Sequence, residues 1–301
     1  MEFFKDTQFD FLGRKRLFII ASLLLTFAGL ASLVLKGGPR YGIDFKGGAV
    51  MDVLWNGTPP VGQIRSALST RLTDVAVVAA HDVTGSNEVL ISTQFGSEPE
   101  FAGIRQIIDD TLAQFGGTYS VRSFEVVGPQ IGKDLRKQAV MATASASAGM
   151  LAYLAWRFRW IYGAAAVIAV VHDTLITIGL FSLTAKEISL TVVAALLTLI
   201  GYSMNDTIVI FDRIRENRTR LPNEPLAAIV NLSVNQTLSR TVLTSGLTLL
   251  AALSLLWLGG PVLNGFSFAL VAGIVVGTYS SIFVASPILV AWEQWTRGGV
   301  R

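Results

Sequence analysis

Six long runs of predominantly apolar residues constrain the fold of this chain more than any other feature of its sequence. They lie at residues 17–35, 138–156, 160–184, 188–211, 241–258 and 266–292. Each run is long enough to cross about 30 Å of hydrocarbon as an α-helix, at roughly 1.5 Å per residue. The last two come from one tract without charged residues, 241–292, which Gly259-Gly260-Pro261 and Asn264-Gly265 are expected to split. The chain is therefore predicted to be an α-helical integral membrane protein with six transmembrane helices that cross the lipid bilayer.

Basic residues predict the orientation of these helices. They gather before the first run, between the second and third, after the fourth and after the sixth: Lys5, Arg14, Lys15, Arg16, Arg157, Arg159, Arg213, Arg215, Arg218, Arg220, Arg297 and Arg301. By the positive-inside rule, both termini are expected to be cytoplasmic, with the first run retained as an uncleaved anchor. Lys133, Arg136 and Lys137 lie on the opposite side, but they belong to a long translocated segment, where the rule has little force.

The composition argues against several classes of function. Only 15% of the residues are charged and the net charge is +3, with the basic residues dispersed at helix ends, so nucleic-acid binding is not expected. There is no cysteine, and the two histidines, His81 and His172, are far apart, which gives no metal-ligand pattern. The sequence also lacks a glycine-rich phosphate loop and a nucleophile elbow. We therefore expect no enzyme activity, no cofactor and no metal site.

Residues 37–132 differ from the rest of the chain in their mixed polarity and ordinary charge. Their pattern predicts strands at 49–55, 75–82, 89–94 and 118–127, and helices at 61–72 and 100–115. The order β-α-β-β-α-β is that of a ferredoxin-like α+β domain, an antiparallel sheet backed by two helices. The chain is thus divided into a cytoplasmic N-terminus with the first transmembrane helix (1–36), an extracytoplasmic domain (37–132) and a five-helix membrane region with a cytoplasmic C-terminus (133–301).

Two adjacent polar residues, Asn205 and Asp206, interrupt the fourth apolar run. An ionisable group at membrane depth costs roughly 2.5–3.5 kcal/mol on insertion scales, so it usually faces a bundle interior or a water-filled path. One interpretation is a site that binds or passes protons. The other is a neutral Asp206 that only forms a hydrogen bond with a neighbouring helix.

Five stretches, in order along the chain, resemble motifs of the SecF family, membrane subunits of the bacterial Sec protein-export machinery. Residues 41–48, YGIDFKGG, resemble the GIDFxGG signature of that family, and 127–135, VGPQIGKDL, resemble its second motif. His172-Asp173 resembles its HD motif, and 201–217 and 235–241 complete the set. One departure is Lys46, where many members have threonine. The glycines and Asp44 of the motif are present, so this departure affects at most a local contact of residue 46.

This resemblance implies a fold and a function. It implies that the six helices form half of a bundle like that of the RND transporters, and that the chain pairs with SecD in the bacterial cytoplasmic (inner) membrane. It further implies that the pair uses the proton motive force to complete preprotein translocation through the SecYEG channel after the ATP-dependent SecA step. Proton flow would drive movement of the periplasmic domains, which would pull on the translocating preprotein.

The resemblance also places a proton-path carboxylate at Asp206 and its partner at Arg240. The alternative for Arg240 is an interfacial side chain that extends to water. Asn205 would form a hydrogen bond with a helix backbone or orient Asp206. His172 and Asp173 would either extend the proton path or form a buried polar contact, because titratable chains inside membranes often serve proton relays.

The remaining residues of the two motifs flank the external domain. Glycine at these junctions suits close backbone approach, and domain motion is concentrated in a few junction residues. Hinges and rigid turns are both compatible with the pattern. The residues concerned are Gly42, Asp44, Gly47, Gly48, Gly128, Pro129 and Gly132.

Two other functions are compatible with six membrane spans and one external domain. An autonomous proton-coupled small-solute exporter of the RND type would share the intramembrane carboxylate, but it would work without Sec partners. A membrane-anchored binding module would need neither Asp206 nor Arg240. The protein-export subunit is the preferred hypothesis.

Overall fold

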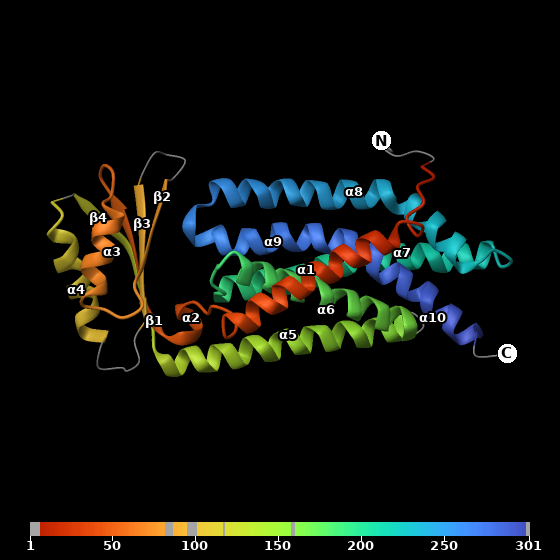
Figure 1. Ribbon diagram of the computed structural model, residues 1–301, viewed down its shortest axis with the longest axis horizontal. Coiled ribbons are helices and arrows are strands. Elements are labelled where there is room, and N and C mark those ends of the chain that lie inside the picture. The colour runs from red at the N-terminus through yellow and green to blue at the C-terminus, as the bar shows by residue number, and fades with distance from the viewer. Residues whose placement is uncertain (1–6, 82–86, 95–100, 117, 158–159, 299–301) are drawn as a thin grey trace.

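The chain folds into a bundle of long helices with a small sheet-containing domain at one end (Figure 1). The computed structural model describes residues 7–81, 87–94, 101–116, 118–157 and 160–298. In Figure 1, α1 begins and α10 ends toward the end of the bundle that lies farthest from the sheet. The protein is therefore elongated. The sheet domain lies at one end, and the start of α1 and the end of α10 lie at the other.

The six predicted spans are all present as helices long and apolar enough to cross a membrane. A helix satisfies every backbone hydrogen bond internally, which is why apolar runs become helices in lipid. The spans are α1 (Lys15–Leu35), α5 (Pro129–Arg157), α6 (Trp160–Leu183), α7 (Leu190–Arg220), α8 (Leu226–Leu258) and α9 (Gly260–Ser280), the last continuing through the π-helical turn η2 (Ser281–Ala285) into α10 (Ser286–Gly298).

The last two spans begin earlier than the apolar pattern predicts. Helix α8 starts at Leu226 rather than near residue 241, because its more polar first half is also helical and packs into the core through buried side chains such as Val230 and Val234. Helix α9 starts at Gly260, so the turn predicted at Asn264-Gly265 is wrong and those residues are helical. Gly259, which caps both helices, and Gly260, at φ +72°, form the turn between them, within the predicted Gly259-Gly260-Pro261 turn.

The sixth span is interrupted beside Pro287. Proline has no backbone N–H and its ring crowds the preceding turn, which disturbs regular helical hydrogen bonding. The helix forms the π-helical turn η2 just before this proline. The Ser286 hydroxyl donates a hydrogen bond to the carbonyl of Ser281, 2.8 Å away. Beyond this point α10 leaves the direction of α9 (Figure 1).

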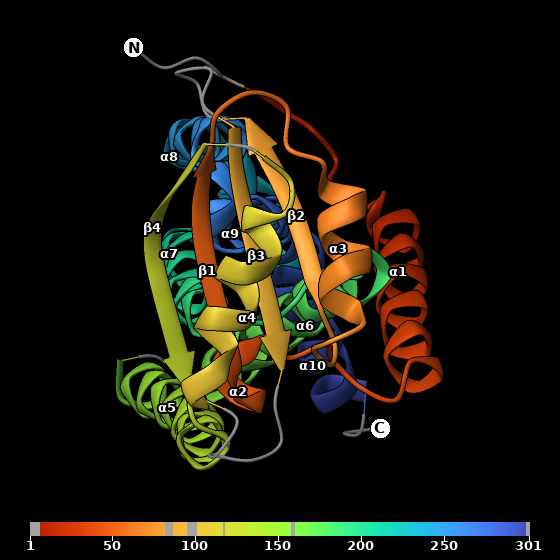
Figure 2. The same ribbon diagram turned by 90° about the vertical axis from the view of Figure 1, so that its left-hand side faces the viewer.

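The external domain is a four-stranded antiparallel sheet in the order β2-β3-β1-β4. Figure 2 shows α3 and α4 on the sheet face that points away from the helical bundle. The element order and this sheet order are those of the predicted ferredoxin-like domain. The elements are β1 (Gly48–Trp55), α3 (Val61–Ser69), β2 (Ala76–His81), β3 (Asn87–Gln94), α4 (Phe101–Ala113) and β4 (Tyr119–Val127).

The core of this domain follows from alternation along its strands. Met51 and Val53 of β1 are fully buried, while the residues between and beside them are only half-buried. They pack against Ile64 of α3 and Ile108 of α4 in one apolar cluster. The side chain of His81, at the end of β2, lies outside the described residues.

One short helix, α2 (Ile43–Lys46), was not predicted. It lies between the end of α1 and the start of β1, beside the first turns of α5 (Figure 1). A single helical turn is too short to give a periodic signal in the sequence. This turn positions the GIDFKGG motif at the junction between the sheet and the bundle.

Candidate functional site

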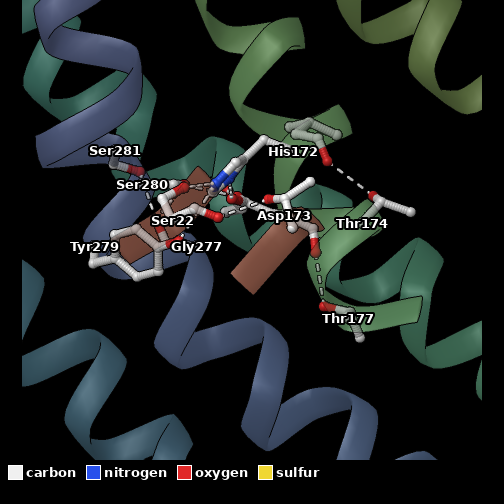
Figure 3. A network of polar contacts seen from close by, with 12 residues as sticks. Ser22, His172, Asp173, Thr174, Thr177, Gly277, Tyr279, Ser280 and Ser281 are labelled. Carbon is white, nitrogen blue, oxygen red and sulfur yellow. Dashed lines mark hydrogen bonds and ion pairs between the residues drawn. The ribbon is translucent and has the colours of Figure 1, made fainter. Parts of the chain in front are cut away.

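A buried carboxylate, Asp173 of α6, lies at the centre of a polar network inside the bundle (Figure 3). The side chain is only 1% exposed. Its Oδ2 accepts hydrogen bonds from the hydroxyls of Ser203 of α7 at 2.6 Å and of Ser280 of α9 at 2.8 Å. Its Oδ1 lies 2.9 Å from Nδ1 of His172. The network therefore joins three membrane helices through one carboxylate.

His172 extends this network to α1. Its Nε2 forms a hydrogen bond with the hydroxyl of Ser22, and the Tyr279 hydroxyl of α9 lies 3.4 Å from the same nitrogen (Figure 3). One ring nitrogen thus faces the carboxylate of Asp173 and the other faces two hydroxyls. An imidazole held in this way is able to accept a proton at one nitrogen and release one from the other.

Asp206 of α7 is the second buried carboxylate, 3% exposed. Its Oδ2 accepts a hydrogen bond from the Ser245 hydroxyl of α8 at 2.8 Å. The neighbouring Thr207 exchanges a hydrogen bond with Ser281 at 2.8 Å. Because Asp206 follows Ser203 by three residues, it lies about 4.5 Å further along α7 than the hydroxyl that binds Asp173. Both buried carboxylates therefore belong to the same polar layer of the bundle.

The other two predicted site residues face outward. The side chains of Asn205 and Arg240 are exposed, and within the described parts of the chain neither one forms a hydrogen bond or ion pair with Asp206. Ser245 makes the hydrogen bond to Asp206, and neither of the two roles predicted for Asn205 is tested by this geometry. The positive charge of Arg240 nevertheless acts electrostatically on the Asp206 carboxylate, so the predicted pairing of these two residues stays a prediction.

The hydroxyls of this layer were missed by the sequence analysis. Serine and threonine are common in membrane helices and give no signal singly, because each can bond to its own backbone one turn earlier. A weak signal was present, since Ser203, Asp206 and Thr207 are spaced to share one face of α7. The hydroxyls missed were those of Ser22, Ser203, Ser245, Tyr279, Ser280 and Ser281.

The first motif clamps the start of α7 to the external domain. The Asp44 carboxylate accepts a hydrogen bond from the backbone N–H of Leu190, the first residue of α7, at 2.6 Å. The Gly42 N–H donates to the carbonyl of Ile188 at 2.9 Å, and the Ile188 N–H donates to the carbonyl of Arg40 at 2.7 Å. A carboxylate at a helix N-terminus is favoured by the unpaired N–H groups and the helix dipole.

The glycines of both motifs allow backbones to approach closely at this clamp. Gly47 has φ +87°, and a Cβ there would lie 2.8 Å from Cα of Pro129. A Cβ on Gly132 would lie 3.0 Å from the carbonyl oxygen of Phe45. The structure brings all the predicted junction residues to this one region: Gly42, Asp44, Gly47, Gly48, Gly128, Pro129 and Gly132.

Glu187, in the loop before α7, is a titratable group at the same junction. Although the residue is exposed as a whole, partial desolvation of its carboxyl raises the pKa above the ordinary 4.5, and the negative charge of Asp74 adds to this effect. The positive charges of Arg40 and Lys46 oppose it without cancelling it. The net result is a carboxyl that holds its proton more tightly than a free glutamate does.

The arrangement as a whole suits proton binding more than bond chemistry. Within the described residues, no group of three or more His, Cys, Asp or Glu side chains is arranged to hold a metal ion. Two carboxylates, one imidazole and several hydroxyls lie instead inside the helices that are long and apolar enough to cross a membrane. Groups of this kind form proton relays in membrane proteins.

Comparisons with known proteins agree with this architecture. Residues 107–295 match the model of the C-terminal region of the SecD/SecF protein export membrane proteins. The chain is 41% identical to the protein translocase subunit SecF of Koribacter versatilis, over 98% of this chain and 94% of that relative. It is also 41% identical to the protein translocase subunit SecDF of Thermus thermophilus, over 96% of this chain and 39% of the relative.

A solved structure shares the fold. The crystal structure of SecDF from Thermus thermophilus matches with a TM-score of 0.83 and 40% identity, over 96% of this chain and 39% of that one. The chain thus spans about two fifths of SecDF and nearly all of the SecF relative. These similarities do not favour an autonomous small-solute exporter. The chain belongs to the SecD/SecF family of protein translocase subunits.

Proposed function

We propose that this chain works as the SecF half of a proton-driven export unit. Together with SecD, it uses the proton motive force to complete the passage of preproteins through SecYEG after the ATP-dependent SecA step. The protein lies in the bacterial cytoplasmic membrane with both termini in the cytoplasm, and its sheet domain meets the preprotein in the periplasm. It carries out no chemical turnover of its own. The observation that carries this proposal is the pair of buried carboxylates, Asp173 and Asp206, inside a member of this family.

A SecD-like partner accounts for the exposed face of α7. Thr198, Gly201 and Asn205 follow one another at helical spacing and are exposed, although they lie within a membrane span. Small and polar residues of this kind are typical of contacts between membrane helices and are unfavourable against lipid. We expect the partner to cover this stripe and to contact Arg240, which lies on the neighbouring helix α8.

The clamp at Asp44 supplies a route from proton binding to domain movement. A change in the protonation of Asp206 alters the packing of α7 against α8, where Ser245 now donates to the carboxylate. The first residue of α7 is bonded to Asp44, which lies four residues before the start of β1. A shift of α7 therefore moves the start of β1 through this hydrogen bond. Gly47 and Pro129 are the positions where the backbone bends.

The test is late translocation in vesicles that contain SecYEG, SecD and this chain. SecA is inactivated when translocation is half complete, and a proton gradient is then imposed. Asp206→Asn is expected to abolish gradient-driven completion. The matched control is Asp212→Asn, the same change six residues further along α7, where the side chain is 59% exposed. Completion at the wild-type rate with Asp206→Asn, or equal loss with both variants, would overturn the proposal.

A further inference from the structure

A groove of 390 Å³ opens between α5, α6 and α7, directly beneath the junction with the sheet domain. Its lining is mainly apolar and comes from four parts of the chain. It includes Tyr41, Phe45, Arg136, Val140, Ile178 and Leu196. The guanidinium of Arg136 lies 5.2 Å from the centre of the Tyr41 ring, at the end of the groove nearest the sheet. The groove is therefore lined mainly by apolar side chains and has the positively charged Arg136 at one end.

Two further bases stand beside this cation. A second hollow shares Phe45, Arg136 and Val140 with the groove, and it adds Lys133 and Lys137. The three bases occupy positions i, i+3 and i+4 of α5, which share one face of a helix. None of them forms an ion pair with a carboxylate in the described parts of the chain, and Asp134 lines neither hollow. Among the residues that the structure describes, this cluster of positive charge therefore has no carboxylate as a counter-ion.

The length of the groove along α5 matches the thickness of one leaflet of a membrane. Helix α5 has 29 residues and is therefore about 44 Å long, which exceeds the hydrocarbon thickness of about 30 Å. If Arg157 marks one hydrocarbon boundary, the other lies about 20 residues earlier, near Lys137. From Arg136 the groove runs to Ser147, roughly 16 Å along the helix and close to half the hydrocarbon thickness. The bases thus stand at headgroup level and the apolar part lies among the acyl chains.

We infer that this groove binds one anionic phospholipid from the leaflet nearest the sheet domain. The headgroup phosphate lies among Lys133, Arg136 and Lys137, and one acyl chain enters the groove between α5 and α7. Unpaired bases at headgroup level recognise acidic lipid headgroups, and a groove one leaflet deep suits an acyl chain. A helix from a partner protein would fill the apolar part but would leave the three charges without a counter-ion unless it carried its own acids.

The lipid would contact the junction between the sheet and α7. Tyr41 and Phe45 flank the clamp residue Asp44, and Leu196 lies in the second turn of α7. A bound acyl chain would therefore brace the segment that joins α7 to the sheet. This consequence depends on the proposed function, whereas lipid binding itself does not.

The test is native mass spectrometry of the purified SecD complex of this chain, titrated with dioleoyl phosphatidylglycerol and, separately, with dioleoyl phosphatidylcholine. We expect phosphatidylglycerol to bind at least tenfold more tightly. Lys133→Gln with Arg136→Gln should weaken its binding about 30-fold, at roughly a factor of five for each base removed. The control, Arg71→Gln with Arg105→Gln, removes the same charge from exposed positions of the sheet domain and should leave binding unchanged.

A second pair of variants leaves the charges intact. Ala144→Phe fills the groove, which Ala144 lines, and should displace both lipids. Ala146→Phe places the same side chain at an exposed position of α5 outside the groove and should have no effect. The inference is overturned if the two phospholipids bind equally, or if each variant matches its control. It is also overturned if glycerol phosphate without acyl chains competes equally well, or if lipid binds only when SecD is removed.

Discussion

The clamp between Asp44 and α7 leads to a quantitative prediction. The Asp44 carboxylate is half-buried and accepts from the Leu190 N–H at 2.6 Å, at an end of α7 where the amides lack helical partners. Ser189 caps the same first turn through its own hydroxyl, which accepts from the Val192 N–H at 3.3 Å. Replacing Asp44 by alanine therefore removes one bond at the start of α7 and leaves the other cap in place.

The size of the effect follows from the charge on the acceptor. Hydrogen bonds to charged groups contribute about 1.5–3 kcal/mol, and partial exposure places Asp44 near the lower end of that range. A loss of about 1.5–2 kcal/mol corresponds to roughly 10–30-fold faster exchange of the Leu190 amide through local opening. Asp44→Asn keeps an acceptor oxygen and loses only its charge near the helix dipole, about 0.3–1 kcal/mol, so it should accelerate exchange about fivefold at most.

The assay is hydrogen–deuterium exchange of the purified protein in detergent, resolved to single amides around Leu190. Asp52→Ala is the control, since it removes a carboxylate of β1 that makes no ion pair within the described residues. Unchanged exchange at Leu190 in Asp44→Ala would refute the clamp. Faster exchange spread over the whole sheet would assign Asp44 to the folding of the domain instead.

Three further predictions concern stability in detergent, measured as Tm. A Cβ on Gly179 would lie 2.8 Å from Cα of Gly29, so Gly179→Val should cost about 1–3 kcal/mol, whereas Gly149→Val, with nothing within 4 Å, should cost less; equal Tm values would contradict this packing. Asp173→Asn should cost about 1–3 kcal/mol, because two serine hydroxyls lose a charged acceptor, and a wild-type Tm would argue against the network. The folded state raises the pKa of Glu187, so the stability of the protein should fall as the pH rises from 4.5 through that raised pKa. Glu187→Gln should make Tm depend less on pH over this range, and an unchanged pH dependence of Tm would contradict the role of Glu187.

Much of the fold was predictable because the membrane imposes a simple rule on sequence. Inside hydrocarbon a helix must be apolar for about 20 residues, and all six spans carry that signal. Outside hydrocarbon the rule ends, so the polar first half of α8, from Leu226, was not recognised as helix. Alternation along the strands was enough to predict the ferredoxin-like domain, but the single turn α2 between Ile43 and Lys46 is too short for any periodic signal.

The site was only partly predictable, for a different reason. An acid within an apolar run stands out in a sequence, and both Asp173 and Asp206 are buried. Which side chain an acid meets depends on how helices rotate and cross, and one sequence does not contain that information. The hydrogen bond from Ser245 to Asp206 therefore emerged only with the structure, beside the electrostatic effect of Arg240 on the same carboxylate.

The two carboxylates are unequally satisfied, and this difference bears on their roles. Both oxygens of Asp173 have partners inside the chain, whereas among the described residues only Oδ2 of Asp206 accepts a hydrogen bond, from Ser245. Asp206 is buried, but it directly follows Asn205, which belongs to the exposed stripe that we assign to the partner. A carboxylate whose two oxygens both have partners is fixed in place by them, whereas an oxygen without such a partner among the described residues leaves room for a further contact. We therefore expect Asp206 to exchange the coupling proton as Arg240 and the partner move, and Asp173 to hold the helices that position it.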